Sequence, residues 1–343
     1  LVGSEMCIRD RILYTLLIMF PVVASAQINT DRVMAIGRNA LYFEDYVLSI
    51  QYFNQVINAK PYLSDPYFYR GLAKINLDDF QGAESDCSEA IERNPFVVSA
   101  YQVRGLARIQ QNNFAGAIED YTKALEFDPE NIGVWHNMAL CRIRQEDYKG
   151  AKNDLDKLIA ISPRYTKAYL MRGEVDLKQK DTLAAEKDFG KAIEIDRYDA
   201  DTWASRAILR LQQQRYKDAE ADFDHAIRLS TRNSGVYINR ALARYHQNNL
   251  RGAMSDYDIA LDIDPNNFIG HYNRGLLRAQ VGDDNRAIQD FNFVIEMEPD
   301  NMMAIFNRGL LLDQTGDYKG AIKDYSTVIN EYPNFLLGYQ YRA

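Results

Sequence analysis

Residues 98–131 read VSAYQVRGLARIQQNNFAGAIEDYTKALEFDPEN, and residues 234–267 read SGVYINRALARYHQNNLRGAMSDYDIALDIDPNN. Each stretch is 34 residues long, and the second begins four such lengths after the first. Both place arginine, alanine, asparagine, aspartate and proline at many of the same points. A fixed period of this size is typical of chains built from stacked copies of one supersecondary unit. One copy cannot bury its apolar face alone, so the period predicts a stack.

The same period extends through most of the chain. With Thr30 taken as position 1, nine consecutive units of 34 residues reach residue 335, and residues 336–343 match the start of a tenth. Position 32 is proline in seven units, position 8 is always Gly or Ala, and position 20 is Ala in eight. Position 24 is mostly aromatic, and position 28 is always Ile or Leu. The sequence therefore consists mainly of one repeated unit.

Each unit is predicted to form two helices, because apolar residues recur at intervals of three and four. The small residues at positions 8 and 20 would let the two helices approach closely. Position 16 carries a helix N-cap residue in eight units, namely Asp45, Asp79, Asn113, Asp147, Asp181, Asn249, Asp283 and Asp317. The proline at position 32 ends the second helix. These features predict nine helical hairpins and no sheet.

This pattern closely resembles the tetratricopeptide-repeat family, which shares the period and the order of aromatic, Gly, Ala and Pro positions. The resemblance covers residues 30–343. It implies an all-α, right-handed α-solenoid of nine 34-residue helical hairpins, truncated in a tenth. It also implies a concave groove in which family members hold peptides or partner proteins. Because the tenth unit stops after its first helix, we expect the natural protein to be longer.

The amino terminus resembles a secretory signal peptide. Two arginines precede an apolar run at 12–20, and an A-x-A motif ends at Ala26. We expect cleavage there, leaving residues 27–343 as the solenoid, exported to the periplasm or cell envelope of a bacterium. A membrane anchor is the alternative, but the segment is shorter than the ~20 residues that span a bilayer and contains proline. Residues 1–11 lack an initial Met, and part of them is expected not to be native.

Composition and motifs argue against catalysis, metal binding and nucleic-acid binding. The net charge of −8 disfavours nucleic acid as a partner, because phosphate binding requires a basic surface. Cys7, Cys87 and Cys141 fit neither a disulfide framework nor a metal set, and the latter two are predicted to be buried. No phosphate loop, nucleophile elbow or HExxH motif occurs. We therefore predict no catalytic residues, no metal, no cofactor, and no membrane insertion after signal cleavage.

A charged column accompanies the small residues. Position 23 is Asp in eight units, and position 7, usually apolar in the family, is Arg in seven. Repeated carboxylates could indicate metal or acid chemistry, but their pairing with Arg favours structural ion pairs. We expect Asp256 to contact Arg240 or Arg244, and Asp290 to contact Arg274 or Arg278. Arg308 and Asp324 form the equivalent pair, and Arg142 is expected to replace Met138 beside Asp154.

The first helix of each unit lines the groove in this family. Position 6 carries Asn137, Asn239, Asn273 and Asn307, the last three in consecutive units. Beside them at positions 5 and 9 stand Tyr272, Phe306, Leu242, Leu276 and Leu310. Asn amides can bond both N–H and C=O of an extended peptide, which resembles the asparagine ladder of O-linked N-acetylglucosamine transferase. Alternatively, Asn is simply tolerated there. The Lys and Asn pair of chaperone-tail binders is missing, which disfavours that partner class.

Three functions fit these observations. The favoured one is a non-enzymatic, exported scaffold that holds a protein or extended peptide in its groove. The second is a recruiting or regulatory arm of a larger enzyme or sensor whose active domain lies beyond residue 343. The third is an assembly protein that oligomerises through exposed repeat faces. The sequence names neither the partner nor the oligomeric state.

Overall fold

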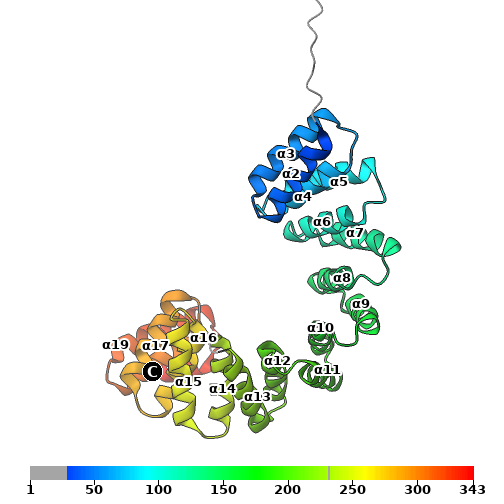
Figure 1. Cartoon of the computed structure of the whole chain (residues 1–343). Coiled ribbons are helices and arrows are strands. Elements are labelled where there is room, and N and C mark those ends of the chain that lie inside the picture. The colour runs from blue at the N-terminus through cyan, green and yellow to red at the C-terminus, as the bar shows by residue number, and fades with distance from the viewer. Residues whose placement is uncertain (1–28, 231) are drawn as a thin grey trace, which may run out of the picture. The chain divides into compact units, whose positions relative to one another are not determined.

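The structure is a computed structural model that describes residues 29–230 and 232–343. Across these residues it contains only helices, turns and loops, with no β-strand (Figure 1). The signal peptide predicted at 1–26 lies outside the described residues. Within the described part of the chain, no helix has the length and apolar character needed to span a membrane. The all-α prediction is therefore confirmed.

The helices alternate as the 34-residue period requires, and they form nine hairpins and one further helix in the described ranges. The first helices of the hairpins are α2 (Thr30–Tyr42), α4 (Asp65–Ile75), α6 (Val98–Gln110), α8 (Ile132–Arg144), α10 (Thr166–Lys178), α12 (Ala200–Gln212), α14 (Ser234–His246), α16 (Phe268–Gln280) and α18 (Met302–Gln314). The second helices are α3 (Tyr46–Ala59), α5 (Phe80–Arg93), α7 (Phe114–Phe127), α9 (Tyr148–Ile161), α11 (Thr182–Ile195), α13 (Tyr216–Leu229), α15 (Leu250–Ile263), α17 (Asp284–Met297) and α19 (Tyr318–Glu331). The tenth unit contributes α20 (Leu336–Arg342).

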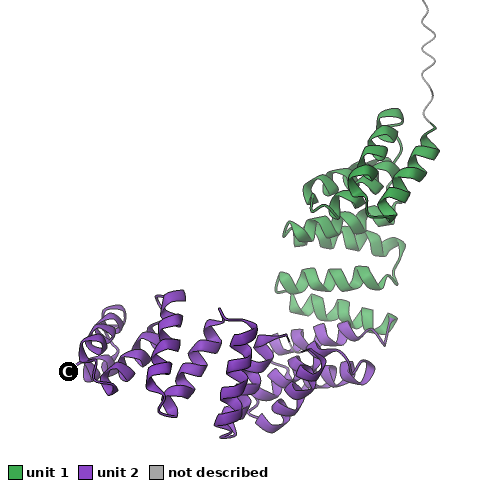
Figure 2. Cartoon of the chain, turned by 60° about the vertical axis from the view of Figure 1, so that its left-hand side comes forward, with its two compact units in different colours: residues 1–161 green, residues 162–343 purple. Residues whose placement is uncertain are grey.

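The chain divides into two compact units, with the boundary between residues 161 and 162 (Figure 2). The first contains the hairpins from α2 to α9, and the second contains those from α10 to α19 together with α20. Inside each unit the second helix of one hairpin packs against the first helix of the next. Neighbouring hairpins thus bury the apolar faces that a single copy would leave open.

The turn inside each hairpin ends one helix and begins the next. In the third hairpin Asn112 adopts φ 59°, and its N–H donates to the carbonyl of Ile109 at 2.9 Å. The N–H of Asn113 donates to the carbonyl of Arg108 at 2.8 Å, which completes a Schellman cap. The side chain of Asn113 then accepts a hydrogen bond from the N–H of Gly116 at 3.1 Å. One residue therefore closes the first helix and caps the second.

The predicted N-caps are confirmed in seven hairpins. The capping side chains belong to Asp45, Asp79, Asn113, Asp147, Asp181, Asn249 and Asp317. In the eighth hairpin Asp283 is the N-cap residue of α17 as predicted, but its side chain accepts no hydrogen bond from a backbone N–H among the described residues. Its carboxylate lies 3.5 Å from Nη1 of Arg286, which is one turn into α17.

Close packing within a hairpin depends on the small residue at position 8. A Cβ built on Gly105 would lie 2.7 Å from the ring of Tyr121, and one on Gly173 would lie 2.6 Å from the ring of Phe189. The atoms nearest to these glycines thus belong to the ring at position 24, rather than to the alanine at position 20. The large ring fills the space that the small residue leaves, so the two positions form one packing unit.

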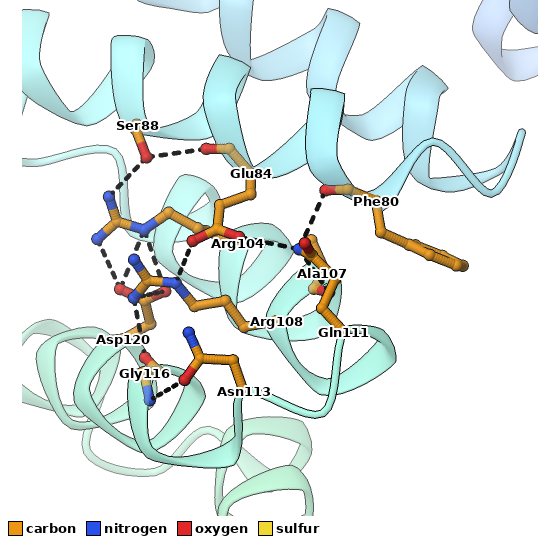
Figure 3. Close-up of polar contacts among 10 residues, drawn as sticks. All are labelled: Phe80, Glu84, Ser88, Arg104, Ala107, Arg108, Gln111, Asn113, Gly116 and Asp120. Carbon is orange, nitrogen blue, oxygen red and sulfur yellow. Dashed lines mark hydrogen bonds and ion pairs between the residues drawn. The ribbon is translucent and has the colours of Figure 1, made fainter.

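Ion pairs join the two helices of the third hairpin and also link it to the preceding hairpin (Figure 3). Asp120 is buried on α7 and accepts hydrogen bonds from Nη2 of Arg104 at 2.6 Å and Nη1 of Arg108 at 3.0 Å. The same two arginines reach back to α5, where Nη1 of Arg104 bonds Ser88 at 3.1 Å and Nε of Arg108 bonds Glu84 at 2.8 Å. The arginines therefore bind three helices together.

This arrangement recurs at positions 7, 11 and 23 of several other hairpins, and we call it the arginine–aspartate column. Asp256 accepts from Arg240 at 2.6 Å and from Arg244 at 2.9 Å. The remaining pairs are Arg70–Asp86, Arg104–Asp120, Arg172–Asp188, Arg206–Asp222, Arg274–Asp290 and Arg308–Asp324, with Arg278 also on Asp290. Desolvation offsets most of the Coulomb attraction, so the column fixes the register between packed helices more than it stabilises the folded protein.

The fourth hairpin departs from the column. Position 7 is Met138, and Asp154 is held by Nη1 of Arg142 alone, at 2.8 Å from Oδ1. Its Oδ2 is buried without a hydrogen-bond partner in the described residues. Burial raises the pKa of Asp154 to about 7, against the attraction of Arg142 and with a further contribution from Asp147. This hairpin therefore contains a buried carboxyl that titrates near neutral pH.

Candidate peptide-binding surface

Three asparagines recur on the first helices of the second unit. Asn239, Asn273 and Asn307 lie on α14, α16 and α18, and each is partly exposed. The leucines three residues later share the same helix faces. Among them, Leu276 is 40% exposed, whereas Leu242 and Leu310 are partly buried. Both polar and apolar side chains of the predicted surface are thus reachable from solvent.

A hydrogen bond links two neighbouring hairpins at this surface. Nδ2 of Asn307 donates to the hydroxyl oxygen of Tyr272 at 3.1 Å. Burial raises the pKa of Tyr272, while the bond from Asn307 opposes this shift. The phenol is therefore protonated at neutral pH, and its own hydrogen can be donated to an acceptor such as a peptide carbonyl. Position 5 of one hairpin and position 6 of the next are thus joined by a hydrogen bond at this surface.

The sequence predicts Phe306 beside the asparagines on the groove surface, but its ring is mostly buried. Its side chain is 8% exposed, with ring centroids 5.1 Å from Phe335 and 5.9 Å from Tyr341. Because α20 and the turn before it cover the ring, most of its surface belongs to the core. It reaches a pocket of about 400 Å³ together with Met303 and Tyr332.

Position 2 supplies an apolar row that the sequence analysis did not single out. Ile269, Met303 and Leu337 are 50%, 57% and 47% exposed and occupy position 2 of consecutive units. Earlier units carry small or charged residues there, namely Asp31, Asp65, Ser99, Gly133, Lys167, Asp201 and Gly235. A pocket of about 280 Å³ connects this row to the predicted surface, and it is lined by Phe268, Ile269, Tyr272, Asn301 and Met303. Reading the column at position 2 would have revealed the row.

Asn137 is separate from the other three asparagines. It lies on α8 in the first unit, and position 6 of the two following units is Met171 and Ser205. The asparagine column is therefore interrupted along the chain. We restrict the candidate surface, called the asparagine surface below, to Asn239, Asn273 and Asn307 with their neighbours on α14, α16 and α18.

Reactive or metal-binding side chains do not gather in the described parts of the chain. Residues 29–230 and 232–343 hold no group of three or more His, Cys, Asp or Glu side chains placed to share a metal ion. Burial raises the pKa of Cys87 to about 12 and that of Cys141 to about 11, so both thiols are protonated at neutral pH. Their expected burial as small hydrophobic residues is confirmed.

Sequence models of one family match most of the repeated region. A model described as TPR repeat matches residues 105–141, and two described as tetratricopeptide repeat match 132–199 and 205–268 with 272–334. The chain belongs to the tetratricopeptide-repeat family. Members of this family generally mediate protein–protein interactions, and their scaffold is typically non-enzymatic. A search of curated proteins found no match.

Solved structures of the tetratricopeptide fold resemble the chain. A tetratricopeptide repeat protein from Parabacteroides merdae ATCC 43184 is 21% identical with a TM-score of 0.56, over 73% of this chain and 98% of that one. The C-terminal part of a TPR repeat-containing protein from Cytophaga hutchinsonii is 17% identical with a TM-score of 0.57, over 70% and 98%. Pseudomonas aeruginosa PilF is 19% identical with a TM-score of 0.53, over 63% and 97%. At these identities the likeness shows the fold alone.

Proposed function

We propose that the chain is an exported, non-enzymatic scaffold that holds an extended segment of a partner protein on the asparagine surface. The observation that carries this proposal is the exposed apolar row of Ile269, Met303 and Leu337 beside the asparagines. Soluble proteins seldom expose a contiguous apolar patch unless it contacts a partner. The family's general role in protein–protein interaction supports the same conclusion.

The two kinds of side chain suit different parts of an extended peptide. Asn amides and the Tyr272 hydroxyl can bond the peptide backbone whatever its sequence, and the apolar row with its pocket can receive alternate side chains. Asn239, Asn273 and Asn307 are neutral, so binding should depend only weakly on salt concentration. Export remains part of the proposal on the basis of the amino-terminal sequence.

A peptide selected from a displayed random library on residues 27–343 would serve as the ligand for a direct test. Replacing Asn239, Asn273 and Asn307 with alanine should weaken its binding by about one to three decades, since each lost hydrogen bond contributes roughly 0.5–1.5 kcal/mol. Isothermal calorimetry measures the affinity, and circular dichroism checks that the helices persist.

The matched control replaces three exposed asparagines outside the first helices, Asn266, Asn285 and Asn330, with alanine. That variant should bind as the parent does. Equal affinity of the parent and the Asn239, Asn273 and Asn307 variant, or equal loss in both triple variants, would contradict the assignment of the surface.

A further inference from the structure

Position 25 of each second helix commonly supplies an oxygen atom to the arginine of the following hairpin. Nη1 of the position 7 arginine donates to this oxygen at 2.5–3.1 Å in five hairpins. The pairs are Arg70 with Asn54, Arg104 with Ser88, Arg240 with Asp224, Arg274 with Asp258, and Arg308 with Asn292. In five hairpins, therefore, Nη1 of the position 7 arginine binds a side-chain oxygen atom of the preceding hairpin.

The sixth hairpin lacks that oxygen, because position 25 of the preceding helix α11 is Gly190. Arg206 keeps its contact with the column, donating from Nε and Nη2 to Asp222 at 2.8 Å each. Its Nη1 has no acceptor among the described residues, although the side chain is only 15% exposed. A Cβ built on Gly190 would meet nothing within 4 Å, so open space lies where these other hairpins have a side-chain oxygen.

That space is a pocket of about 620 Å³ formed by α11, α12, α13 and the turn between α11 and α12. Its polar lining is mostly basic and comprises Arg197, Arg206, His225, Arg228 and Glu194. Glu194 is paired with Lys191 at 2.8 Å and Arg206 with Asp222 at 2.8 Å, so Arg197 and Arg228 supply the positive charge of the pocket within a chain of net charge −8. Nη2 of Arg228 donates to Nδ1 of His225 at 2.9 Å. Arg197 also stands where seven other units have proline, so two departures from the repeat converge on one pocket.

The pocket also has an apolar wall. The ring of Trp203 stacks on that of His225, with centroids 4.2 Å apart and planes at 16°. The guanidinium of Arg206 lies 5.0 Å from the Trp203 ring, which helps to hold it in place. Ile193, Leu229 and the exposed Tyr198 complete the lining. A volume of this size suits one or two side chains.

We propose that this pocket binds the carboxylate of an acidic side chain, flanked by an apolar residue, in a partner protein. The carboxylate would bond Nη1 of Arg206 as the Asp224 carboxylate bonds Arg240, with Arg228 and Arg197 balancing its charge. Its apolar neighbour would contact Trp203 and Leu229. The pocket is formed mainly by α11, α13 and a turn, so it is distinct from the asparagine surface, which lies on α14, α16 and α18.

The test uses the indole resonances of the two tryptophans, assigned through Trp203→Phe. Both indoles donate to a backbone carbonyl, Trp203 to Arg197 and Trp135 to Pro129, so Trp135 in the first unit is an internal control. The probes are acetyl-Leu-Glu-Leu-amide, its neutral counterpart acetyl-Leu-Gln-Leu-amide, and inorganic phosphate. We expect the Glu peptide to shift the Trp203 resonance saturably and to bind about tenfold or more tightly than the Gln peptide, since hydrogen bonds to charged groups are the strong ones.

Variants at Gly190 decide whether the pocket is responsible. Gly190→Asp and Gly190→Asn restore the oxygen found in the other hairpins and should each reduce binding of the Glu peptide at least about tenfold. Gly190→Ala adds a methyl group to the pocket but no acceptor, so it should reduce binding of the Glu peptide less than either of these variants. The neutral Asn variant keeps the test valid if the added Asp charge impairs folding.

Three results would overturn the proposal. One is equal binding of the Glu and Gln peptides, and another is undiminished binding after Gly190→Asn. The third is phosphate binding as tightly as the Glu peptide, because the pocket would then be a general anion site. A saturable response confined to Trp203, selective for the Glu peptide and lost on filling position 190, would support it.

Discussion

One substitution should have opposite effects at two equivalent positions of this chain. Asp154 and Asp256 both occupy position 23 and both are buried. Asp256 is held by two arginines, whereas Asp154 has one arginine and a carboxylate oxygen without a partner in the described residues. We predict that Asp154→Asn stabilises the protein at pH 8, and that Asp256→Asn destabilises it by roughly 3–5 kcal/mol because two guanidinium groups lose their counter-charge.

The magnitude at Asp154 follows from its pKa, which rises from an ordinary value of 3.8 to about 7 in the folded protein. Between these values the folded state holds a proton that the unfolded state has lost, so stability falls as the pH rises and the loss is complete above about pH 7. The full difference corresponds to roughly 4 kcal/mol as an upper bound. We expect a gain of about 1–3 kcal/mol from Asp154→Asn at pH 8 and almost none at pH 4.

Urea unfolding at pH 4 and pH 8 measures these differences. Hydrogen exchange of the α8 and α9 amides accompanies it, because stacked repeats can unfold in parts. Met138→Arg is the companion variant, since it restores the missing arginine and should lower the pKa of Asp154 and remove the pH-dependent loss. A destabilising effect of Asp154→Asn at pH 8, or an equal gain at both pH values, would refute the reasoning.

Further predictions concern three backbone positions and the predicted signal peptide. Alanine in place of Gly173 should destabilise by about 1–3 kcal/mol in thermal unfolding, because its Cβ would meet the Phe189 ring. The same change at Gly190 should stabilise by roughly 0.5–1 kcal/mol, since a helix-interior glycine there has open space around it; a stability change of the same sign in both variants would contradict one of the two predictions. Lys180→Gly should add roughly 0.5 kcal/mol by relieving a φ of 65°, and no change in urea midpoint would count against it. Amino-terminal sequencing of exported protein should begin at Gln27, and a start upstream of residue 12 would rule out the signal peptide.

The hairpins and their ion pairs could be predicted from residue patterns alone. Helix ends depend on residues near in sequence, such as the asparagine that caps α7, so local chemistry sufficed to place them. The arginine–aspartate pairs could be anticipated because all seven units with Arg at position 7 have Asp at position 23. Repetition also averages over single exceptions, which makes a 34-residue pattern easier to interpret than one isolated segment.

The effect of each exception to the repeat depends on how neighbouring hairpins pack. Met138 and Gly190 are visible in the sequence as departures from the pattern, but the unpaired oxygen of Asp154 and the pocket beside Arg206 appear only when neighbouring hairpins are packed. The burial of Phe306 likewise depends on α20 and the turn before it. These features depend on which atoms meet across helices distant in sequence, and a missing side chain there leaves a cavity or an unsatisfied charge that no local pattern records.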